Sequence, residues 1–302
     1  MADFIPAAPL YARSVLRQAF AALVVAAVIG GCALRPVTFA TPEAPRGIAA
    51  WRTRPAGVPP FPALLLMHGC HGVSASTVQW AEWLTERGYV TLIVDSFTVR
   101  GIAEDCTPQS VDLPPSVRFG DAVGALQYLH ARPDVDRERI GVIGWSAGGS
   151  FAMSLVNGPS LERQARRGVT LPTPGIRAAV AVYPGGCTSF MQEQVIRPLL
   201  VLIGDADDWI TARGCADMVA AMRARGAQAE IVTYPGAYHY FDVVGQPRVF
   251  LGNVVNDNKP GGCCGATVSY DARADADAHR RIAEFFARHL GGARPPADRR
   301  KE

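Results

Sequence analysis

Short apolar runs alternate with amphipathic stretches along most of the chain after residue 60. Six runs predict strands, most of them covered on both faces because nearly every residue in them is apolar: Ala63–Met67, Tyr89–Val94, Arg139–Gly144, Ala178–Tyr183, Leu199–Ile203 and Glu230–Tyr234. Helical spacing of apolar residues predicts the helices between and after them: Ser76–Arg87, Ser116–Arg132, Ala147–Val156, Ala212–Arg225 and Ala276–His289. Because strands separated by helices need crossover connections, we expect an α/β fold with a mainly parallel central sheet and helices on both faces. Residues 61–292 are predicted to form this one domain.

The N-terminal segment has the pattern of an export signal. Arg13 and Arg17 precede the apolar run 19–29, which is shorter than a usual membrane-spanning helix. Ile29-Gly30-Gly31-Cys32 is similar to a bacterial lipobox, which predicts a lipoprotein-type signal peptide over 1–31, cleavage before Cys32 and lipidation of Cys32. The alternative is an ordinary signal peptide followed by a chance cysteine. Residues 32–60, rich in Pro, Ala and Arg, are predicted to be a linker or tether, and 293–302 a polar tail.

Composition limits the classes of partner. The chain has 302 residues, of which 49% are hydrophobic and 19% charged, with a net charge of +3, so a disordered chain is excluded. The basic cluster Arg299-Arg300-Lys301 stands alone, which gives no reason to expect nucleic acid. We expect contact with a membrane only through a lipid anchor at Cys32, in the periplasm or cell envelope.

Six of the seven cysteines follow Cys32 in the sequence, and an even number in an oxidising compartment favours disulfide bonds. A metal site is the competing interpretation. The chain has no CxxC pair, and the spacing of His68 and His71 alone is weak evidence for metal ligation. We therefore predict disulfides, no metal and a loop-shaping role for the two histidines.

The motif Gly144-Trp145-Ser146-Ala147-Gly148 lies between a predicted strand and a predicted helix. In that context G-x-S-x-G is typical of a nucleophile elbow, in which glycines permit a tight turn and the serine oxygen is exposed. The helix that follows directs its first amides toward the same point and favours developing negative charge. The motif predicts Ser146 as nucleophile; a capping serine in an ordinary strand-to-helix turn is the alternative.

Two later strand ends carry the groups that a serine nucleophile needs. Leu199–Ile203 is followed by Asp205, Asp207 and Asp208, and Glu230–Tyr234 is followed by His239. Both sites lie at carboxyl ends of strands, where open α/β sheets collect their ligands. His239 is predicted to be the general base, because imidazole titrates near neutral pH. Asp207 is the favoured partner of His239, with Asp208 as the alternative and Asp205 as a turn cap.

The loop His68-Gly69-Cys70-His71-Gly72 directly follows the first predicted strand. In the α/β-hydrolase fold this loop and the residue after the nucleophile each supply a backbone N–H to the oxyanion hole. The predicted donors are the amides of Cys70 and Ala147.

With these motifs in place, residues 62–290 resemble the dienelactone hydrolase family of α/β-hydrolases. The resemblance rests on His68-Gly69-Cys70, Asp95-Ser96-Phe97, Gly144 to Gly149, Gly204 to Trp209 and His239-Tyr240-Phe241. It implies hydrolysis of small-molecule esters or lactones through an acyl-enzyme, without a cofactor. Family members that open dienelactone use a cysteine nucleophile, so Ser146 makes a general carboxylesterase the better expectation.

The resemblance also suggests roles around the site. Arg100 lies where the family holds a substrate carboxylate, although an exposed surface arginine is an equal alternative. Trp145, Trp209, Tyr183 and Phe241 adjoin the catalytic turns and either line an acyl pocket or belong to the core. If the loop after Asp95 folds back over the pocket, Cys70 pairs with Cys106, and a Cys187–Cys215 pair would brace Asp207. Cys263 and Cys264 pair with each other or stay reduced.

Two other functions remain open at this point. A peptidase or polyester hydrolase would use the same three residues, because this fold hosts many acyl transfers. A binding protein that keeps the fold without catalysis is the alternative from another class, and the presence of all three residues argues against it.

Overall fold

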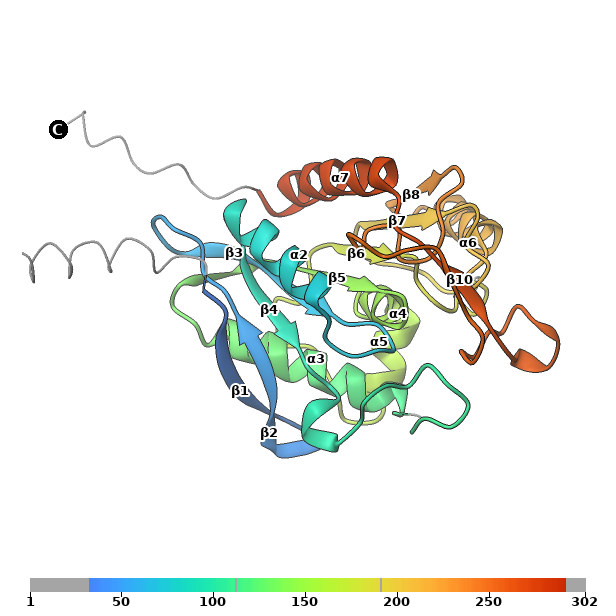
Figure 1. Cartoon of the computed structure of the whole chain (residues 1–302). Helices are drawn as coiled ribbons and strands as arrows, with labels where there is room; N and C mark the ends of the chain where they lie inside the picture. Colours follow the sequence, from blue (N-terminus) through green and yellow to red (C-terminus); the bar gives the residue numbers. More distant parts are fainter. Residues whose placement is uncertain (1–32, 112, 191, 292–302) are drawn as a thin grey trace, which may run out of the picture.

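The structure, a computed structural model, describes residues 33–111, 113–190 and 192–291 and is built around an eight-stranded sheet (Figure 1). The strand order is β1-β2-β4-β3-β5-β6-β7-β8. The pairs β1–β2 and β2–β4 are antiparallel and all other neighbours in this sheet are parallel. The strands are β1 (Arg35–Thr41), β2 (Ala44–Arg52), β3 (Phe61–Met67), β4 (Val90–Val94), β5 (Val135–Trp145), β6 (Ala179–Val182), β7 (Leu199–Gly204) and β8 (Ala229–Tyr234). The predicted mainly parallel α/β sheet is confirmed.

The direction of each crossover places the helices on both faces of the sheet. The helices are α2 (Ala75–Glu86), α3 (Pro115–His130), α4 (Ala147–Ser154), α5 (Gly158–Ala165), α6 (Ala212–Ala224) and α7 (Ala272–Leu290). From β3 the chain moves to β4 in one direction, and from β4 it returns past β3 to β5 in the other. Since such connections are right-handed, α2 and α3 lie on opposite faces. Ring contacts join α7 to α2, and Arg118 of α3 packs on Phe151 of α4.

The central strands are buried from end to end. Every residue of β3, β4, β6 and β7 is buried, as strands covered by helices on both faces must be. Gly141 in β5 permits close packing, because a Cβ there would lie 2.9 Å from side-chain atoms of Leu64 and Leu290. These continuous apolar runs are the signal from which the sheet was predicted.

The predicted tether over 32–60 is wrong for much of its length. Residues 35–52 form the β1–β2 hairpin, which extends the sheet beyond β4 at the lower left of Figure 1. Phe39, Ile48 and Ala50 are buried, so the hairpin contributes side chains to the core. Burial alternates along both strands with a period of two, but Ile48 and Ala50 are flanked by glycine, alanine and tryptophan rather than by polar residues, so the sequence does not show this alternation.

Three shorter elements were also missed. Helix α5 is capped by Asn157, whose Oδ1 accepts a hydrogen bond of 2.8 Å from the Ser160 amide. Within the long connection 243–271, β9 (Val249–Leu251) and β10 (Ala266–Val268) form an antiparallel pair. Two 3₁₀ turns, η1 (Thr98–Arg100) and η2 (Pro260–Gly262), complete the elements. Helix α7 begins four residues before the predicted start, because the Asp271 side chain caps the amides of Arg273 and Ala274.

The predicted signal peptide, Cys32 and the polar tail lie outside the described residues. Within the described part of the chain, no helix combines the length and apolar character needed to cross a membrane.

Candidate active site

Ser146 occupies a strained turn between β5 and α4. Its φ of 53° and ψ of −119° lie in a region that non-glycine residues rarely adopt. The turn depends on glycines, because a Cβ on Gly144 would collide with the carbonyl of Gly148, and one on Gly148 would collide with the carbonyl of Met67. The elbow therefore needs its flanking glycines for steric reasons, and the serine side chain is held at the carboxyl end of the sheet.

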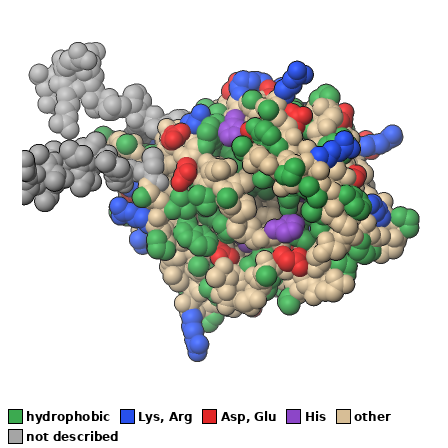
Figure 2. All heavy atoms as spheres, viewed as in Figure 1, with side chains coloured by type: hydrophobic (Ala, Val, Ile, Leu, Met, Phe, Trp, Pro, Cys, Tyr) green, Lys and Arg blue, Asp and Glu red, His purple; other side chains and the backbone are tan. Residues whose placement is uncertain are grey.

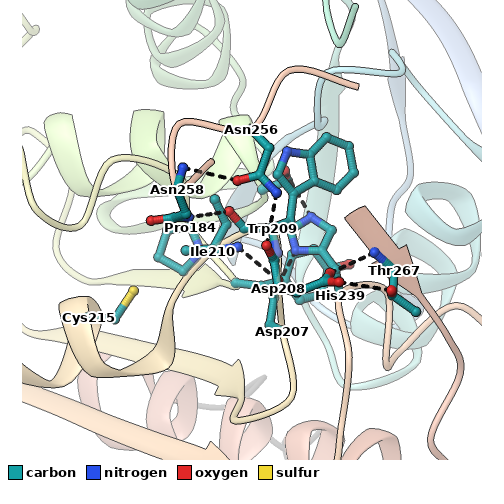
Figure 3. Close-up of polar contacts among 12 residues, drawn as sticks. Pro184, Asp207, Asp208, Trp209, Ile210, Cys215, His239, Asn256, Asn258 and Thr267 are labelled. Carbon is teal, nitrogen blue, oxygen red and sulfur yellow. Dashed lines mark hydrogen bonds and ion pairs between the residues drawn. The ribbon is translucent and has the colours of Figure 1, made fainter. Parts of the chain in front are cut away.

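The structure brings Ser146, His239 and Asp207 into one line of contacts. Nε2 of His239 lies 3.1 Å from Oγ of Ser146, and Nδ1 of His239 lies 2.7 Å from Oδ2 of Asp207 (Figure 3 shows the Asp207–His239 side). All three side chains are buried, with 6%, 0% and 5% of Ser146, His239 and Asp207 exposed. With Nδ1 donating to the carboxylate, Nε2 can accept the serine proton.

The neighbouring aspartates have other partners. Oδ1 of Asp207 accepts hydrogen bonds from the amides of Trp209 and Ile210, which fixes the carboxylate in its turn. Asp208 accepts instead from the amide and the hydroxyl of Thr267 in β10 (Figure 3). Asp205 accepts from the Gly236 amide. The geometry thus selects Asp207 over Asp208 as the partner of His239.

The loop after β3 lies beside Ser146. A Cβ on Gly69 would be 3.5 Å from Cβ of Ser146, so this backbone borders the nucleophile. Ala147 is the first residue of α4, and its amide therefore has no acceptor within the helix. The Cys70 and Ala147 amides, predicted as oxyanion donors, belong to these two segments.

His68 shapes this loop as a neutral residue. The Ser96 amide can only donate, so Nε2 of His68 accepts its hydrogen bond, and Nδ1 is left to donate to the Gly69 carbonyl at 2.7 Å. Burial, followed by the charge of Arg118, lowers the pKa of His68 to about 3. His68 therefore links the ends of β3 and β4 without carrying charge at neutral pH.

The cysteines lie in pairs around the site. The sulfur atoms of Cys70 and Cys106, and those of Cys187 and Cys215, are at bonding distance, and Cys263 is paired with Cys264. Within the described ranges, Cys70, His71 and Cys106 form the one cluster of possible metal ligands, all within 4.8 Å of one another. Its two sulfur atoms lie at bonding distance from each other, and a disulfide between them would leave only the His71 imidazole to bind a cation.

A cavity of about 350 Å³ opens beside Ser146. Trp145 and Tyr183 line it, whereas Phe241 lies in the core and Trp209 packs on the His239 ring and donates to the Val255 carbonyl. Ser146, Tyr183 and Tyr240 are the described non-glycine residues with positive φ, and all three line this cavity. Backbone strain collected at one cavity indicates a functional site.

The model of the dienelactone hydrolase family matches residues 48–290. The chain belongs to the dienelactone hydrolase family. Among relatives, a putative carboxymethylenebutenolidase of Methylorubrum extorquens is 25% identical over 259 residues, covering 80% of this chain and 77% of the relative. A probable 2-oxo-3-(5-oxofuran-2-ylidene)propanoate lactonase of Bradyrhizobium is 23% identical over 210 residues, covering 64% of this chain and 78% of the relative.

Solved structures share the fold. A putative dienelactone hydrolase of Klebsiella pneumoniae aligns with a TM-score of 0.59 and 21% identity, over 84% of this chain and 99% of that one. Esterase 2 of Thermogutta terrifontis, in a structure phosphorylated by paraoxon, aligns with a TM-score of 0.60 and 16% identity, over 88% and 96% of the two chains. Membership of this family makes the protein a carboxylic ester hydrolase.

The structure corrects one role that was expected from the family resemblance. Arg100 does not face the cavity as a carboxylate-binding residue. Its guanidinium makes two bonds of 2.9 Å to the buried carboxylate of Asp121 and a third to the Ser96 carbonyl. Two guanidinium nitrogens pair with the two carboxylate oxygens of a buried acid, and this explains the placement, because a buried charge is costly without a hydrogen-bonded counter-charge.

Sequence reasoning missed Asp242, whose carboxylate holds together residues that line the cavity. The buried carboxylate accepts hydrogen bonds from the indoles of Trp80 and Trp145 at 2.8 Å each and from the hydroxyl of Tyr183 at 2.6 Å. Trp145 precedes the nucleophile, and the Tyr183 ring lies 4.3 Å from that of His239. Burial raises the pKa of Asp242 while these hydrogen bonds lower it, with a net rise. The signal in the sequence was an acid inside the otherwise uncharged stretch Ala237–Gly245.

Proposed function

We propose that this protein cleaves carboxylic esters or lactones through an acyl-enzyme on Ser146. His239 Nε2 removes the proton of Ser146 Oγ as Oγ attacks the carbonyl carbon. The amides of Cys70 and Ala147 bind the resulting oxyanion. Collapse of the intermediate breaks the ester C–O bond, and the proton on His239 passes to the leaving alkoxide. Water then attacks the acyl-enzyme by the same route and releases the acid and Ser146.

One observation carries the proposal. The His239 ring contacts Ser146 Oγ through Nε2 at 3.1 Å and Asp207 Oδ2 through Nδ1 at 2.7 Å, and Ser146 lines a cavity. Asp207 orients the imidazole and stabilises the imidazolium that forms during attack. Its own position is supported by two backbone amides, so the geometry exists before substrate binds.

The experiment compares Ser146→Ala with the wild type on p-nitrophenyl acetate and butyrate. We expect kcat to fall by at least about 10⁴-fold, since the nucleophile is lost. A fluorophosphonate probe should label the wild type and not Ser146→Ala. Ser150→Ala, four residues further along α4, is the matched control and should keep both the label and the activity. Turnover that survives Ser146→Ala would contradict the proposal.

We also propose that the protein is exported, anchored through lipid on Cys32, and oxidised at Cys70–Cys106 and Cys187–Cys215. The lipobox-like motif supports the anchor, and the placement of the cysteine pairs supports the disulfides. Mass spectrometry of the unreduced mature protein should find a diacylglyceryl mass on an N-terminal Cys32 and these two cross-linked peptides. An unmodified N-terminus or free thiols at the four positions would refute the respective part.

A further inference from the structure

We propose that the cavity beside Ser146 accepts esters or lactones without an ionised group and discriminates against those that carry a carboxylate. This inference rests on the proposed function and names its substrate class. It differs from what the resemblance suggested for Arg100, which was a carboxylate-bearing substrate.

The first support is the composition of the cavity wall. Among the described residues that line it there is no Asp, Glu, Lys or Arg. One part of the lining is aliphatic or aromatic and includes Trp145, Leu251 and Val268, and another part offers hydroxyl and amide groups from Thr77 and Gln246. Such a lining can hold an apolar acyl or alcohol group and donate to ester or hydroxyl oxygens, but it contains no counter-ion.

The titratable residues of the wall are uncharged at neutral pH. Burial, assisted by the nearby His239, lowers the pKa of His71 although Glu104 opposes this, and His71 Nδ1 lies 2.8 Å from the Tyr240 hydroxyl. Burial also raises the pKa of both Tyr183 and Tyr240. The cavity therefore presents neither a cation to a substrate carboxylate nor an anion to a substrate ammonium.

Two arginines that pack near the loops of the site, Arg100 and Arg118, are already engaged. Arg100 is held by Asp121, with 15% of its side chain exposed. Arg118 is 1% exposed, donates to the His68 carbonyl, and packs its guanidinium against the rings of Phe97 and Phe151. On the face shown in Figure 2, Lys and Arg side chains lie mostly toward the edge. Neither arginine can turn into the cavity without leaving an uncompensated buried group.

Electrostatics then predicts the direction of selectivity. A carboxylate that enters this cavity loses part of its hydration and finds no opposite charge. It also lies close to the oxyanion that forms during attack on the ester, and like charges at short range repel. We expect the carboxylate to reduce kcat/KM by about a hundredfold, which corresponds to about 2.7 kcal/mol at 1.36 kcal/mol for each tenfold change.

Two aryl acetates of nearly equal size provide the test. 4-Acetoxybenzamide is neutral, and 4-acetoxybenzoate carries a carboxylate at pH 7.5 that is too distant to assist its own hydrolysis. Each kcat/KM is divided by the rate constant for hydrolysis by hydroxide, which removes the difference in leaving-group reactivity. We expect the normalised value to be about a hundredfold higher for the amide. Equal values, or a preference for the benzoate, would overturn the inference. The proposed function would still stand if turnover of both esters depends on Ser146. If neither ester shows Ser146-dependent turnover, the inference and the proposed function are both overturned.

A substitution at Gln246 can introduce the positively charged side chain that the cavity wall lacks. Gln246 lines the cavity from a half-exposed turn. Among the described residues, the side-chain amide of Gln246 donates a hydrogen bond only to the adjacent Pro247 carbonyl. Gln246→Arg should raise normalised kcat/KM for 4-acetoxybenzoate relative to the amide by about tenfold. Gln246→Met, of similar length and uncharged, should not change the ratio. A Gln246→Arg protein with the wild-type ratio would contradict an electrostatic origin of the selectivity.

Discussion

At the scale of single residues, hydrogen-bond partners decide what each of two consecutive aspartates does. Asp207 contacts the His239 imidazole and two amides of its own turn, whereas Asp208 ties that turn to Thr267 in β10. The same residue type therefore contacts the imidazole at one position and the β9–β10 hairpin at the next. Because side chains at adjacent backbone positions point in different directions, Asp207 and Asp208 reach different partners although they are neighbours in the sequence.

Asp207→Asn and Asp208→Asn form a matched pair that tests this division. We expect Asp207→Asn to lower kcat by roughly 10³- to 10⁴-fold with little change in KM, because an amide does not hold the reactive tautomer or stabilise an imidazolium. Asp208→Asn should keep kcat within a few-fold and lower the thermal midpoint. Steady-state kinetics and thermal unfolding of both variants supply the comparison. Equal losses of kcat would show that Asp208 also acts on His239.

At the scale of elements, α7 is joined to α2 through a histidine. His279 stacks on the Trp80 ring with centroids 3.9 Å apart, and Asp275, one turn earlier, lies 2.9 Å from its Nδ1. Burial alone would lower the pKa of His279, but hydrogen bonds to Asp275 and the charges of Asp275 and Asp242 raise it above 6.5. Trp80 also binds Asp242, so this helix pair is connected to the residues that Asp242 holds together.

The raised pKa predicts how stability changes with pH. A group that binds its proton more tightly in the folded state stabilises the fold fully below its unfolded pKa, and this contribution disappears as pH rises through the folded pKa. Relative to His279→Gln, the wild type should therefore be most stable below pH 6.5, and the difference should shrink at higher pH. Urea unfolding at several pH values measures it.

His289→Gln on the same helix is the control for that series. Burial and the charge of Arg288 lower the pKa of His289, so its contribution is present above pH 6.5 and is lost as pH falls. The two variants should thus show opposite slopes against the wild type. Parallel slopes would mean that the Asp275–His279 contact does not persist in solution.

At the scale of the whole molecule, the β1–β2 hairpin is an integral part of the core. It adds two antiparallel strands outside β4 and lies against α3, so the domain begins at residue 35 or earlier rather than at residue 61. The contact is close: a Cβ on Gly124 of α3 would lie 2.7 Å from the Ala40 carbonyl oxygen and 2.9 Å from Cγ2 of Thr41.

Two glycines of α3 test this packing. Gly124→Ala should lower the free energy of unfolding by about 1–3 kcal/mol, because the added methyl overpacks the contact with β1. Gly120→Ala places its methyl 3.6 Å from Pro42, an ordinary contact, and should be neutral or stabilise by up to about 1 kcal/mol through helix propensity. Chemical denaturation of both variants is the measurement. Similar behaviour of the two would mean that residues 35–41 do not pack on α3.

The sequence by itself determined the parallel sheet and the three segments that meet at its edge. Continuous apolar runs show burial on both faces, and carboxyl ends of parallel strands share one edge whatever lies between them. Ser146, Asp207 and His239 were therefore predicted as neighbours from local pattern and chain order, and in the structure their side chains are in contact.

Tertiary structure decided everything that depends on a distant partner. Arg100 pairs with Asp121, 21 residues away. Asp242 accepts hydrogen bonds from Trp80 in α2, Trp145 in β5 and Tyr183. The spacing of residues within a short segment predicts neither contact. The strands at 35–52 likewise exist because β4 offers an edge and α3 a surface, contacts that a short stretch rich in Pro, Ala and Arg does not reveal alone. The reason is physical. The free energy of burial and strand pairing arises only when two segments are in contact, whereas periodicity shows only which face of a segment is apolar.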